Sequence, residues 1–483
     1  MKKILLILLF SSLFLFKLSA KEKKQWYSNS FKSFNIWLLE NGYDHYLDKD
    51  KFIEIQDKSS CNPNVPQVCV DSDGKFIPHD QYKYKKVYEN NLNIKTHPDK
   101  WGIHFPSNPN RDSLIYYFYK SQFSHLTGDE NSYQWKELKV KPSKKPYQFQ
   151  FNLIEDKFVK KQMKSKGILS YLYYQEGKVL IDEISPKERL GEFVNNETKL
   201  RSASMNKSVT SYILGHAICG GYIDSVDSKI DDWPILKDTL FENQKIIDLL
   251  NMAAGDQKYV NEFKFNPNSI LADNSYEYET NNIKATIYLF FKNTEKSKSI
   301  YNYNGFVTQL LLNYTKHKTG DNYKKILNKV FQDKVKNEQS VTFMELNSLE
   351  EYGNGHGMVM ATRFDYLRLA KAMMDDYQND TCVGKYLKEI YKRRIPKNYS
   401  KNKHEPEFNR TKSYGGQFHM DYPGLENRVI FGFGGYGGKA ILIDMENSRI
   451  VVLNSQHFNN DKFKYSIKKL LIDPIKKGEK AFK

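Results

Sequence analysis

A serine and a lysine three residues apart are the first residues of this chain whose types and spacing could do chemistry. Ser204 and Lys207 come just before an apolar stretch that runs to Cys219 and predicts a helix. Residues three apart share a helix face, so the Lys207 amine would lie one turn from the Ser204 hydroxyl. A serine becomes a good nucleophile when a neighbour takes its proton, and a desolvated lysine can do so. A helix-capping serine beside a solvated lysine is the alternative interpretation.

Two later segments contain further residue types suited to such chemistry. Tyr301 and Tyr303 come just before residues 307–314, which predict a helix. A phenol beside a lysine loses its proton more easily, so it could pass a proton from a serine to a leaving group. Residues 429–444 place Gly434 and Gly435 between two apolar runs, which predicts a strand, a turn and a strand. Glycine suits a strand that a substrate approaches closely, although a purely structural turn has the same composition.

The order of these segments closely resembles that of the serine β-lactamase and penicillin-binding-protein superfamily, in particular its class C-like branch of esterases and 6-aminohexanoate-oligomer hydrolases. There the Ser-x-x-Lys helix is followed by an LLxMxxG segment, which residues 249–255 match. A Tyr-x-Asn or Tyr-x-Ser motif then opens a helix with a QLL sequence, which begins here at Gln309. The six-residue spacing to Gln309 in that pattern selects Tyr303, and Tyr301 remains the alternative.

Two other segments contain sequence motifs of the family. Thr362 and Asp365 resemble its TxxDxxR helix, and the resemblance implies a structural role as a capping pair. Residues 318–320 read Lys-Thr-Gly, the family's third motif, but they lie between two predicted helices. Gly320 is therefore expected to end a helix, and Lys318 is not expected to contribute to the site.

The resemblance instead places the third motif at Phe433, Gly434 and Gly435, where the family has Lys-Thr-Gly or His-x-Gly. The cation that would bind a substrate carboxylate is then missing. Lys439 starts the next predicted strand and is not expected to replace that cation. We therefore expect an apolar wall with exposed strand backbone at this position.

The remaining expectations about the site also come from the resemblance. It implies an oxyanion hole made by the backbone N–H groups of Ser204 and Tyr436. Gly305 stands where the family often has Asn or Ser, which removes a polar contact to a substrate amide. The resemblance implies neither a metal nor an organic cofactor, and no Cys-His spacing predicts a zinc site.

The resemblance implies an α+β fold, with an antiparallel sheet flanked by helices beside an all-helical lobe. A helix is predicted over residues 146–164, a strand, turn and strand over 168–184, and another helix over 244–252. Residues 256–300 are polar and read as a long connection. The expected domains are a signal peptide at 1–20, an irregular N-terminal extension at 21–145 that packs on the main domain, and a hydrolase domain at 146–483.

The N-terminus and the cysteines indicate export. Lys2 and Lys3 precede apolar residues 4–16, which predicts a secretory signal, either cleaved or kept as an uncleaved anchor. The expected location is periplasmic or secreted, with no transmembrane domain in the mature chain. Residues 61 and 69 are cysteines that predict a local disulfide, and Cys219 and Cys382 either pair across the fold or remain free. The net charge of +17 comes from scattered lysines, and no nucleic-acid motif is present.

The combined expectation is an exported serine hydrolase that cleaves a small-molecule ester or amide. Ser204 would carry the acyl group, with Lys207 and Tyr303 as general base and proton relay. The alternative is a non-catalytic module of the same fold that binds peptidoglycan or a protein partner. The missing third-motif cation favours an esterase or amide hydrolase over a β-lactamase. The sequence assigns no role to residues 21–145 and no oligomeric state.

Overall fold

A computed structural model describes most of the second half of the chain and part of the first. The described residues are 135–261, 271–272, 283–346, 358–397, 411–456 and 465–477, with short pieces at 37, 40–41, 95–96, 103–104, 115 and 118. The predicted signal peptide and the predicted disulfide between residues 61 and 69 lie outside these residues. Among the described residues, no helix is long and apolar enough to cross a membrane.

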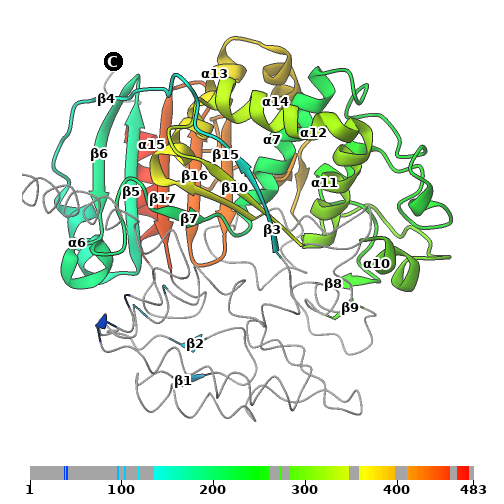
Figure 1. Ribbon diagram of the computed structural model, residues 1–483, viewed down its shortest axis with the longest axis horizontal. Helices are drawn as coiled ribbons and strands as arrows, with labels where there is room; N and C mark the ends of the chain where they lie inside the picture. Colours follow the sequence, from blue (N-terminus) through cyan, green and yellow to red (C-terminus); the bar gives the residue numbers. More distant parts are fainter. Residues whose placement is uncertain are drawn as a thin grey trace, which may run out of the picture.

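A nine-stranded sheet forms one side of the described part of the chain, on the left in Figure 1. Its order is β12-β13-β14-β15-β16-β17-β5-β6-β4, and every pairing is antiparallel except that of β4 with β6. The predicted strands at 168–184 and 429–444 are present and lie in this sheet. The bounds are β4 Gln150–Phe151, β5 Ile168–Gln175, β6 Lys178–Ile184, β12 Ile395–Pro396, β13 Ser413–Gly415, β14 Phe418–Met420, β15 Ile430–Gly435, β16 Lys439–Asp444 and β17 Arg449–Ser455.

Helices cover both faces of this sheet, which explains why its central strands are continuously apolar. On β17, Ile450 and Val452 join the core shared with α7, α13 and α14, whereas Val451 and Leu453 join the core shared with α6 and α15. This alternation follows from the two-residue period of a strand. These helices are α6 Lys157–Ser165, α7 Met205–Cys219, α13 Arg363–Gln378, α14 Cys382–Lys392 and α15 Asp473–Lys477, with the helical turns η4 Lys187–Gly191 and η9 Lys468–Ile472.

A helical lobe lies beside the sheet, on the side of α7 (Figure 1). Helix α7 packs against α11, α12 and α14 and is buried on nearly every side, so it has no polar face. The lobe consists of α8 Ile246–Leu250, α10 Ile283–Phe290, α11 Gly305–Thr319 and α12 Tyr323–Asn328, with the turns η5 Pro234–Leu236, η6 Gly320–Asn322 and η7 Lys329–Val335. The α+β plan predicted from the sequence is confirmed.

A second, four-stranded sheet leads into α7. Its order is β3-β10-β11-β7, and β7 ends three residues before Ser204. Strand β3 pairs with β10 along its whole length, although it precedes residue 146, the predicted start of the hydrolase domain. The bounds are β3 Trp135–Val140, β7 Lys199–Arg201, β10 Val341–Leu346 and β11 Met358–Thr362; two small pairs, β1 Lys95–Thr96 with β2 Ile103–His104 and β8 Val260–Asn261 with β9 Leu271–Ala272, complete the strands.

Described side chains from the predicted N-terminal extension lie in the main core. The ring of Trp37 packs edge-on against Phe193 at 4.7 Å between centroids, and the ring of Phe118 stacks on Phe193 at 5.7 Å. All three rings are buried. At these two positions, side chains from before residue 135 contribute to the main core.

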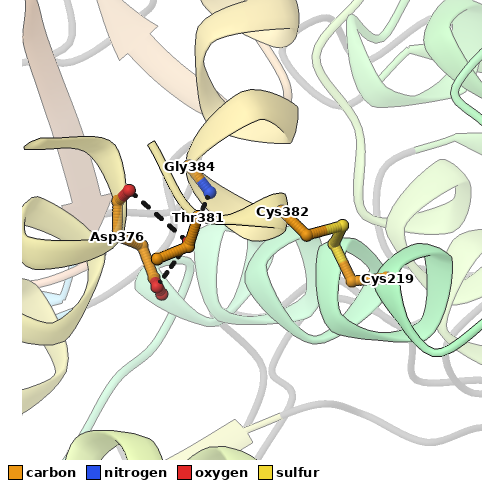
Figure 2. The surroundings of a disulfide bond; sticks show 5 residues. All are labelled: Cys219, Asp376, Thr381, Cys382 and Gly384. Carbon is orange, nitrogen blue, oxygen red and sulfur yellow. Dashed lines mark hydrogen bonds between the residues drawn. A yellow bond between two sulfur atoms is a disulfide. The ribbon is translucent and has the colours of Figure 1, made fainter. Parts of the chain in front are cut away.

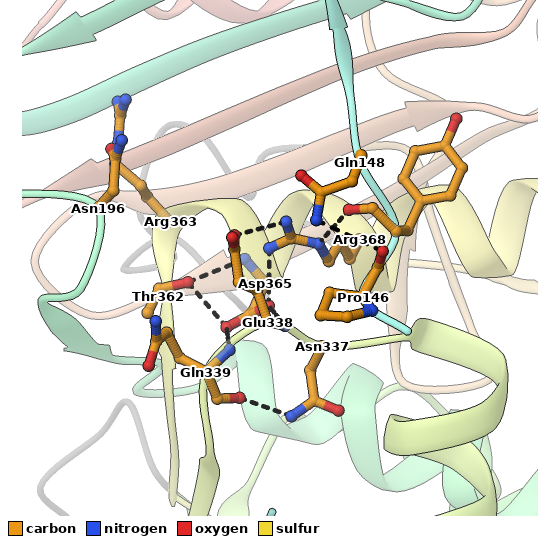
Figure 3. A network of polar contacts seen from close by, with 11 residues as sticks. Pro146, Gln148, Asn196, Asn337, Glu338, Gln339, Thr362, Arg363, Asp365 and Arg368 are labelled. Atoms are coloured by element: carbon orange, nitrogen blue, oxygen red, sulfur yellow. Dashed lines mark hydrogen bonds and ion pairs between the residues drawn. The ribbon is translucent and has the colours of Figure 1, made fainter. Parts of the chain in front are cut away.

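A polar network fixes the start of α13 (Figure 3). The Asp365 N–H donates to the Thr362 hydroxyl at 3.1 Å, which makes Thr362 the helix cap. The Arg368 guanidinium donates to Asp365 at 2.9 Å and to Glu338 at 2.7 Å. The matched TxxDxxR segment therefore has the structural role expected of it.

One disulfide joins two helices. The bond between Cys219 and Cys382 connects the last residue of α7 to the first of α14 (Figure 2). Thr381 caps α14 by accepting the Gly384 N–H at 3.1 Å. Of the two alternatives for these cysteines, the structure has the pair.

Two sequence predictions differ from the structure in extent. The helix predicted over 146–164 begins only at Lys157, because Asp156 accepts the N–H groups of Phe158 and Val159 and so caps it there. The residues before it form β4, which pairs with β6. The helix predicted over 244–252 is confined to α8, and the long connection after it contains α10.

Candidate active site

Ser204 lies at the N-terminus of α7, where the chain leaves β7 through a strained turn. Ala203 has a positive φ of 47°, a conformation that costs energy for a residue with a β-carbon. Two hydrogen bonds fix Ser202 to the backbone of Val359. The Ser202 N–H donates to the Val359 carbonyl at 2.8 Å, and the Ser202 hydroxyl accepts the Val359 N–H at 3.0 Å. Ser204 itself is half-buried, and its side chain makes no capping bond. Its hydroxyl is therefore not used to cap the helix.

Lys207 is buried beside that hydroxyl. Its Nζ lies 3.5 Å from Ser204 Oγ, and the side chain is only 9% exposed. A distance of 3.5 Å is at the outer limit of a hydrogen bond, and such contacts tighten when a substrate is bound. The alternative of a capping serine with a solvated lysine does not describe this geometry.

Tyr303 is the second neighbour of Lys207. The Lys207 Nζ lies 4.8 Å from the centre of the Tyr303 ring, and this ring is 5% exposed. Tyr301 is equally buried, but the cation over its ring is Lys397, at 5.5 Å. The structure thus brings Ser204, Lys207 and Tyr303 together. Tyr303, rather than Tyr301, is also the tyrosine that the six-residue spacing to Gln309 selects.

Helix α11 begins directly after this tyrosine. Asn304 caps it by accepting the Val307 N–H at 3.0 Å, and Gly305 is its first residue. At the other end, Lys318 lies in the last turn and forms an ion pair with Asp232, and Gly320 ends the helix with a positive φ of 50°. The Lys-Thr-Gly letters at 318–320 therefore lie at a helix end, as predicted, and not on a strand.

The glycine-rich end of β15 lies against the turn that precedes Ser204. A Cβ placed on Gly435 would be 2.6 Å from the Ser202 carbonyl oxygen and 3.2 Å from the Met205 side chain. Only glycine fits at this distance, so Gly435 brings the strand backbone next to the turn that holds Ser204. Strand β14 pairs with β15 only at Gly432. Tyr436 follows the strand with 42% of its side chain exposed.

Phe433 does not form the expected apolar wall. Its side chain is 1% exposed and packs edge-on against Phe418, 5.2 Å between ring centroids. Because side chains alternate along a strand, Phe433 follows Phe431 into the core shared with α7. Any contribution of Phe433 to a substrate site would come from its backbone.

Lys439 is also turned inward. Its Nζ donates to the Tyr436 carbonyl at 3.0 Å, and its side chain is 5% exposed. Burial, followed by the nearby charge of Arg201, lowers the pKa of Lys439 to about 7. The expectation that Lys439 does not replace the third-motif cation stays a prediction, which this buried position supports.

The sequence analysis did not identify a buried histidine and lysine beside Tyr303. Lys397 Nζ lies 2.8 Å from His419 Nδ1, and the His419 ring stacks on Tyr303 at 6.0 Å. Burial, followed by the charges of Lys397 and Lys207, lowers the pKa of His419 well below its ordinary value. The Nδ1 atom of a neutral imidazole can accept a hydrogen bond from the Lys397 amine. No local pattern marks these residues, because only the strand order brings them to Tyr303.

Gln417 was also missed, and it joins the three helices that carry the motifs. Its N–H donates to the Leu250 carbonyl at the end of α8, at 2.8 Å. Its carbonyl accepts the Ser208 hydroxyl of α7 at 2.8 Å, and its side-chain oxygen accepts the Thr308 hydroxyl of α11 at 2.7 Å. Its backbone has a positive φ of 68°, between β13 and β14. These bonds fix the distance between the Ser204 helix and the Tyr303 helix.

Comparisons of the whole chain find similarity in structure. No protein-family model and no curated protein sequence matches it. A structure described as a 6-aminohexanoate-dimer hydrolase from Bacillus anthracis aligns with a TM-score of 0.51 at 14% identity, over 72% of this chain and 89% of that one.

Two further structures align at lower scores. The hydrolase EstCE1, described as having promiscuous acyltransferase activity, has a TM-score of 0.47 at 12% identity, over 65% of this chain and 94% of its own. A penicillin-binding protein from Bacillus halodurans has a TM-score of 0.44 at 14% identity, over 68% and 100%. The order of motifs, the sheet and helical lobe, and the Bacillus anthracis structure agree, and the chain has the fold of the serine β-lactamase and penicillin-binding-protein superfamily.

Proposed function

We propose that this protein is a serine hydrolase that cleaves an ester or amide bond through an acyl-enzyme on Ser204. The observation that carries the proposal is the position of Lys207, which is buried between the Ser204 hydroxyl and the Tyr303 ring. Burial disfavours the charged form of an amine and so favours its use as a base. A serine and a lysine that served only as a cap and a surface charge would not need this desolvated arrangement.

The proposed reaction has two steps. Ser204 Oγ attacks the substrate carbonyl while Lys207 accepts its proton, and the N–H groups of Ser204 and Tyr436 stabilise the oxyanion. Tyr303 then gives its proton to the leaving alcohol or amine, which departs as the acyl-enzyme forms, and Tyr303 regains a proton from Lys207. In the second step, water attacks the acyl carbon with the same groups as bases, and Ser204 regains its proton as the carboxylic acid leaves.

The proposed substrates are small and uncharged at the acyl group. Neither the backbone glycines nor Phe433 on β15 offer a cation, and Lys439 and Lys397 are both buried with polar partners. A substrate carboxylate beside this strand would lose its hydration without a charge-assisted hydrogen bond in return. Short esters or linear amides are therefore proposed over β-lactams. The predicted signal peptide supports a proposed location in the periplasm or outside the cell.

The test is hydrolysis of an activated ester by the parent protein and by Ser204→Ala. Removing the nucleophile should lower kcat/KM by at least about 10³-fold, because groups that act as a unit are each nearly indispensable. Ser211→Ala is the matched control: it removes another buried serine of α7, one that bonds to Tyr386, and should stay within a few-fold of the parent. Turnover by Ser204→Ala at the parent's rate would leave the non-catalytic module as the better account.

A further inference from the structure

We propose that Asp256 is a positioning residue that holds Tyr303 against Lys207 by binding the residues on both sides of it. The proposal rests on the function proposed above, since it concerns the same tyrosine. Asp256 follows the LLxMxxG segment directly and is fully buried. Nothing in the sequence analysis singled it out.

The contacts of Asp256 are symmetrical about Tyr303. One carboxylate oxygen accepts the Asn302 side-chain amide at 2.9 Å, and the other accepts the Asn304 side-chain amide at 3.0 Å. The backbone adds a third connection, because the Asn302 N–H donates to the Met252 carbonyl at 2.7 Å. Tyr303 is thus the central residue of a segment held at both neighbours, and its ring has little freedom to move away from Lys207.

Asn304 links this arrangement to α11. Its amide NH₂ group donates to Asp256 while its side-chain oxygen accepts the Val307 N–H as the helix cap. Asp256 therefore fixes which way the Asn304 amide points, and so where α11 begins relative to Tyr303. The two oxygens of a carboxylate are both acceptors, which an asparagine at position 256 cannot reproduce.

Burying this carboxylate costs free energy. Burial raises the pKa of Asp256, and because the hydrogen bonds from Asn302 and Asn304 offset only part of that rise, the resulting pKa is about 6. A leucine of similar size would fill the same space without the desolvation of a charge. The placement of two amides around Tyr303 is the feature that an apolar residue could not supply.

The positioning role predicts a signature that depends on the leaving group. Tyr303 acts on the leaving group, so its displacement should matter little for a nitrophenyl ester, whose leaving group needs no proton. It should matter strongly for an alkyl ester of the same acid. A general loss of folding would lower both rates together.

The experiment measures kcat/KM for a p-nitrophenyl ester and the matching ethyl ester in Asp256→Asn, Tyr303→Phe and the double variant. Asp256→Asn should lower the ethyl-ester rate by roughly tenfold more than the nitrophenyl-ester rate, within the range for acid-base groups. In the Tyr303→Phe background it should change either rate by no more than about twofold, because the two residues act in one step. Asn302→Ala, which removes one amide donor and leaves the Asn304 cap, should show the same leaving-group preference if Asp256→Asn folds poorly.

Asp365→Asn is the matched control, because Asp365 is a buried carboxylate with a structural network of its own (Figure 3). It should lower both rates equally or leave both unchanged. Equal loss on both esters in Asp256→Asn and Asn302→Ala, or an Asp256→Asn effect that persists in full without the Tyr303 hydroxyl, would overturn the positioning role while the proposed reaction stands. If Tyr303→Phe itself has no leaving-group effect, the proposed use of Tyr303 fails and the positioning role fails with it.

Discussion

At the scale of single residues, the site depends on which side chains are desolvated. Lys207 is 9% exposed, and the Tyr303 ring and the two rings that contact it, Tyr414 and His419, are all buried. The residue types and spacing of Ser204 and Lys207 could be predicted from the sequence, because helix periodicity relates residues three apart. The burial of Lys207 and the approach of Lys397 and His419 could not, since they arise from segments that are distant in the sequence.

Exchanging each tyrosine for phenylalanine tests the register of the second motif. Tyr303→Phe should lower acylation by about 10²–10⁴-fold on a substrate with a poor leaving group, because it removes the proposed proton relay beside Lys207. Tyr301→Phe is the matched change on a ring that lies by Lys397, and its effect should be mild. Single-turnover kinetics of both variants measure the difference. The reverse order would shift the motif by two residues.

The buried amine of Lys439 predicts a pH dependence of stability. Its pKa falls from 10.5 in the unfolded chain to about 7 in the fold. Between these values the unfolded chain binds the proton and the folded chain does not, so the contribution to the free energy of unfolding should rise with pH, by at most about 1.4 kcal/mol per pH unit. This contribution to the free energy of unfolding is lost as the pH falls towards 7. Denaturant titrations of the parent and Lys439→Met from pH 7 to 9.5 measure it, and an equal slope in both would contradict the assignment.

At the scale of elements, the secondary structure around a sequence motif determines whether the motif can contribute to the site. The Lys-Thr-Gly at 318–320 could be set aside from the sequence because predicted helices flank it, and the structure has it at the end of α11. The core position of the Phe433 side chain could not be predicted, because a strand that is buried on both faces has no polar face to show its orientation. The cap at Asp156 likewise overrode the helical pattern that precedes it.

Replacing Lys318 tests the assignment of the third motif. Lys318→Ala breaks a partly exposed ion pair with Asp232 and should cost only about 0–1 kcal/mol of stability. Turnover of short esters should stay at the parent's level, and nitrocefin should be a far poorer substrate than these esters for both proteins. Efficient nitrocefin hydrolysis that collapses in Lys318→Ala would contradict both the motif assignment and the proposed substrate class.

At the scale of the whole molecule, distant segments hold the site in place. Gln417 ties α7, α8 and α11 together, and the disulfide joins α7 to α14. The order of motifs along the chain was enough to predict the fold, because each motif marks an element of known place in the resembled family. The bonds of Gln417 and Asp256 could not be predicted, since each depends on loops whose course follows from tertiary packing.

Removing the disulfide should destabilise the fold without direct effect on the chemistry. The bond closes a loop with a sequence separation of 163 residues, so Cys219→Ser with Cys382→Ser should lower the free energy of unfolding by about 2–5 kcal/mol. Activity per folded molecule should be retained, because neither cysteine contacts Ser204, Lys207 or Tyr303 among the described contacts. Denaturant unfolding and active-site titration measure the two effects separately. Unchanged stability would contradict the expectation.

The central claim is that Ser204 is the nucleophile, and covalent labelling tests it most directly. A fluorophosphonate should add to the folded protein once per molecule, and peptide mass mapping should place the adduct on Ser204. Ser204→Ala should abolish the label, whereas Ser211→Ala should keep it. An adduct on another residue, or labelling that persists in Ser204→Ala, would contradict the proposed acyl-enzyme.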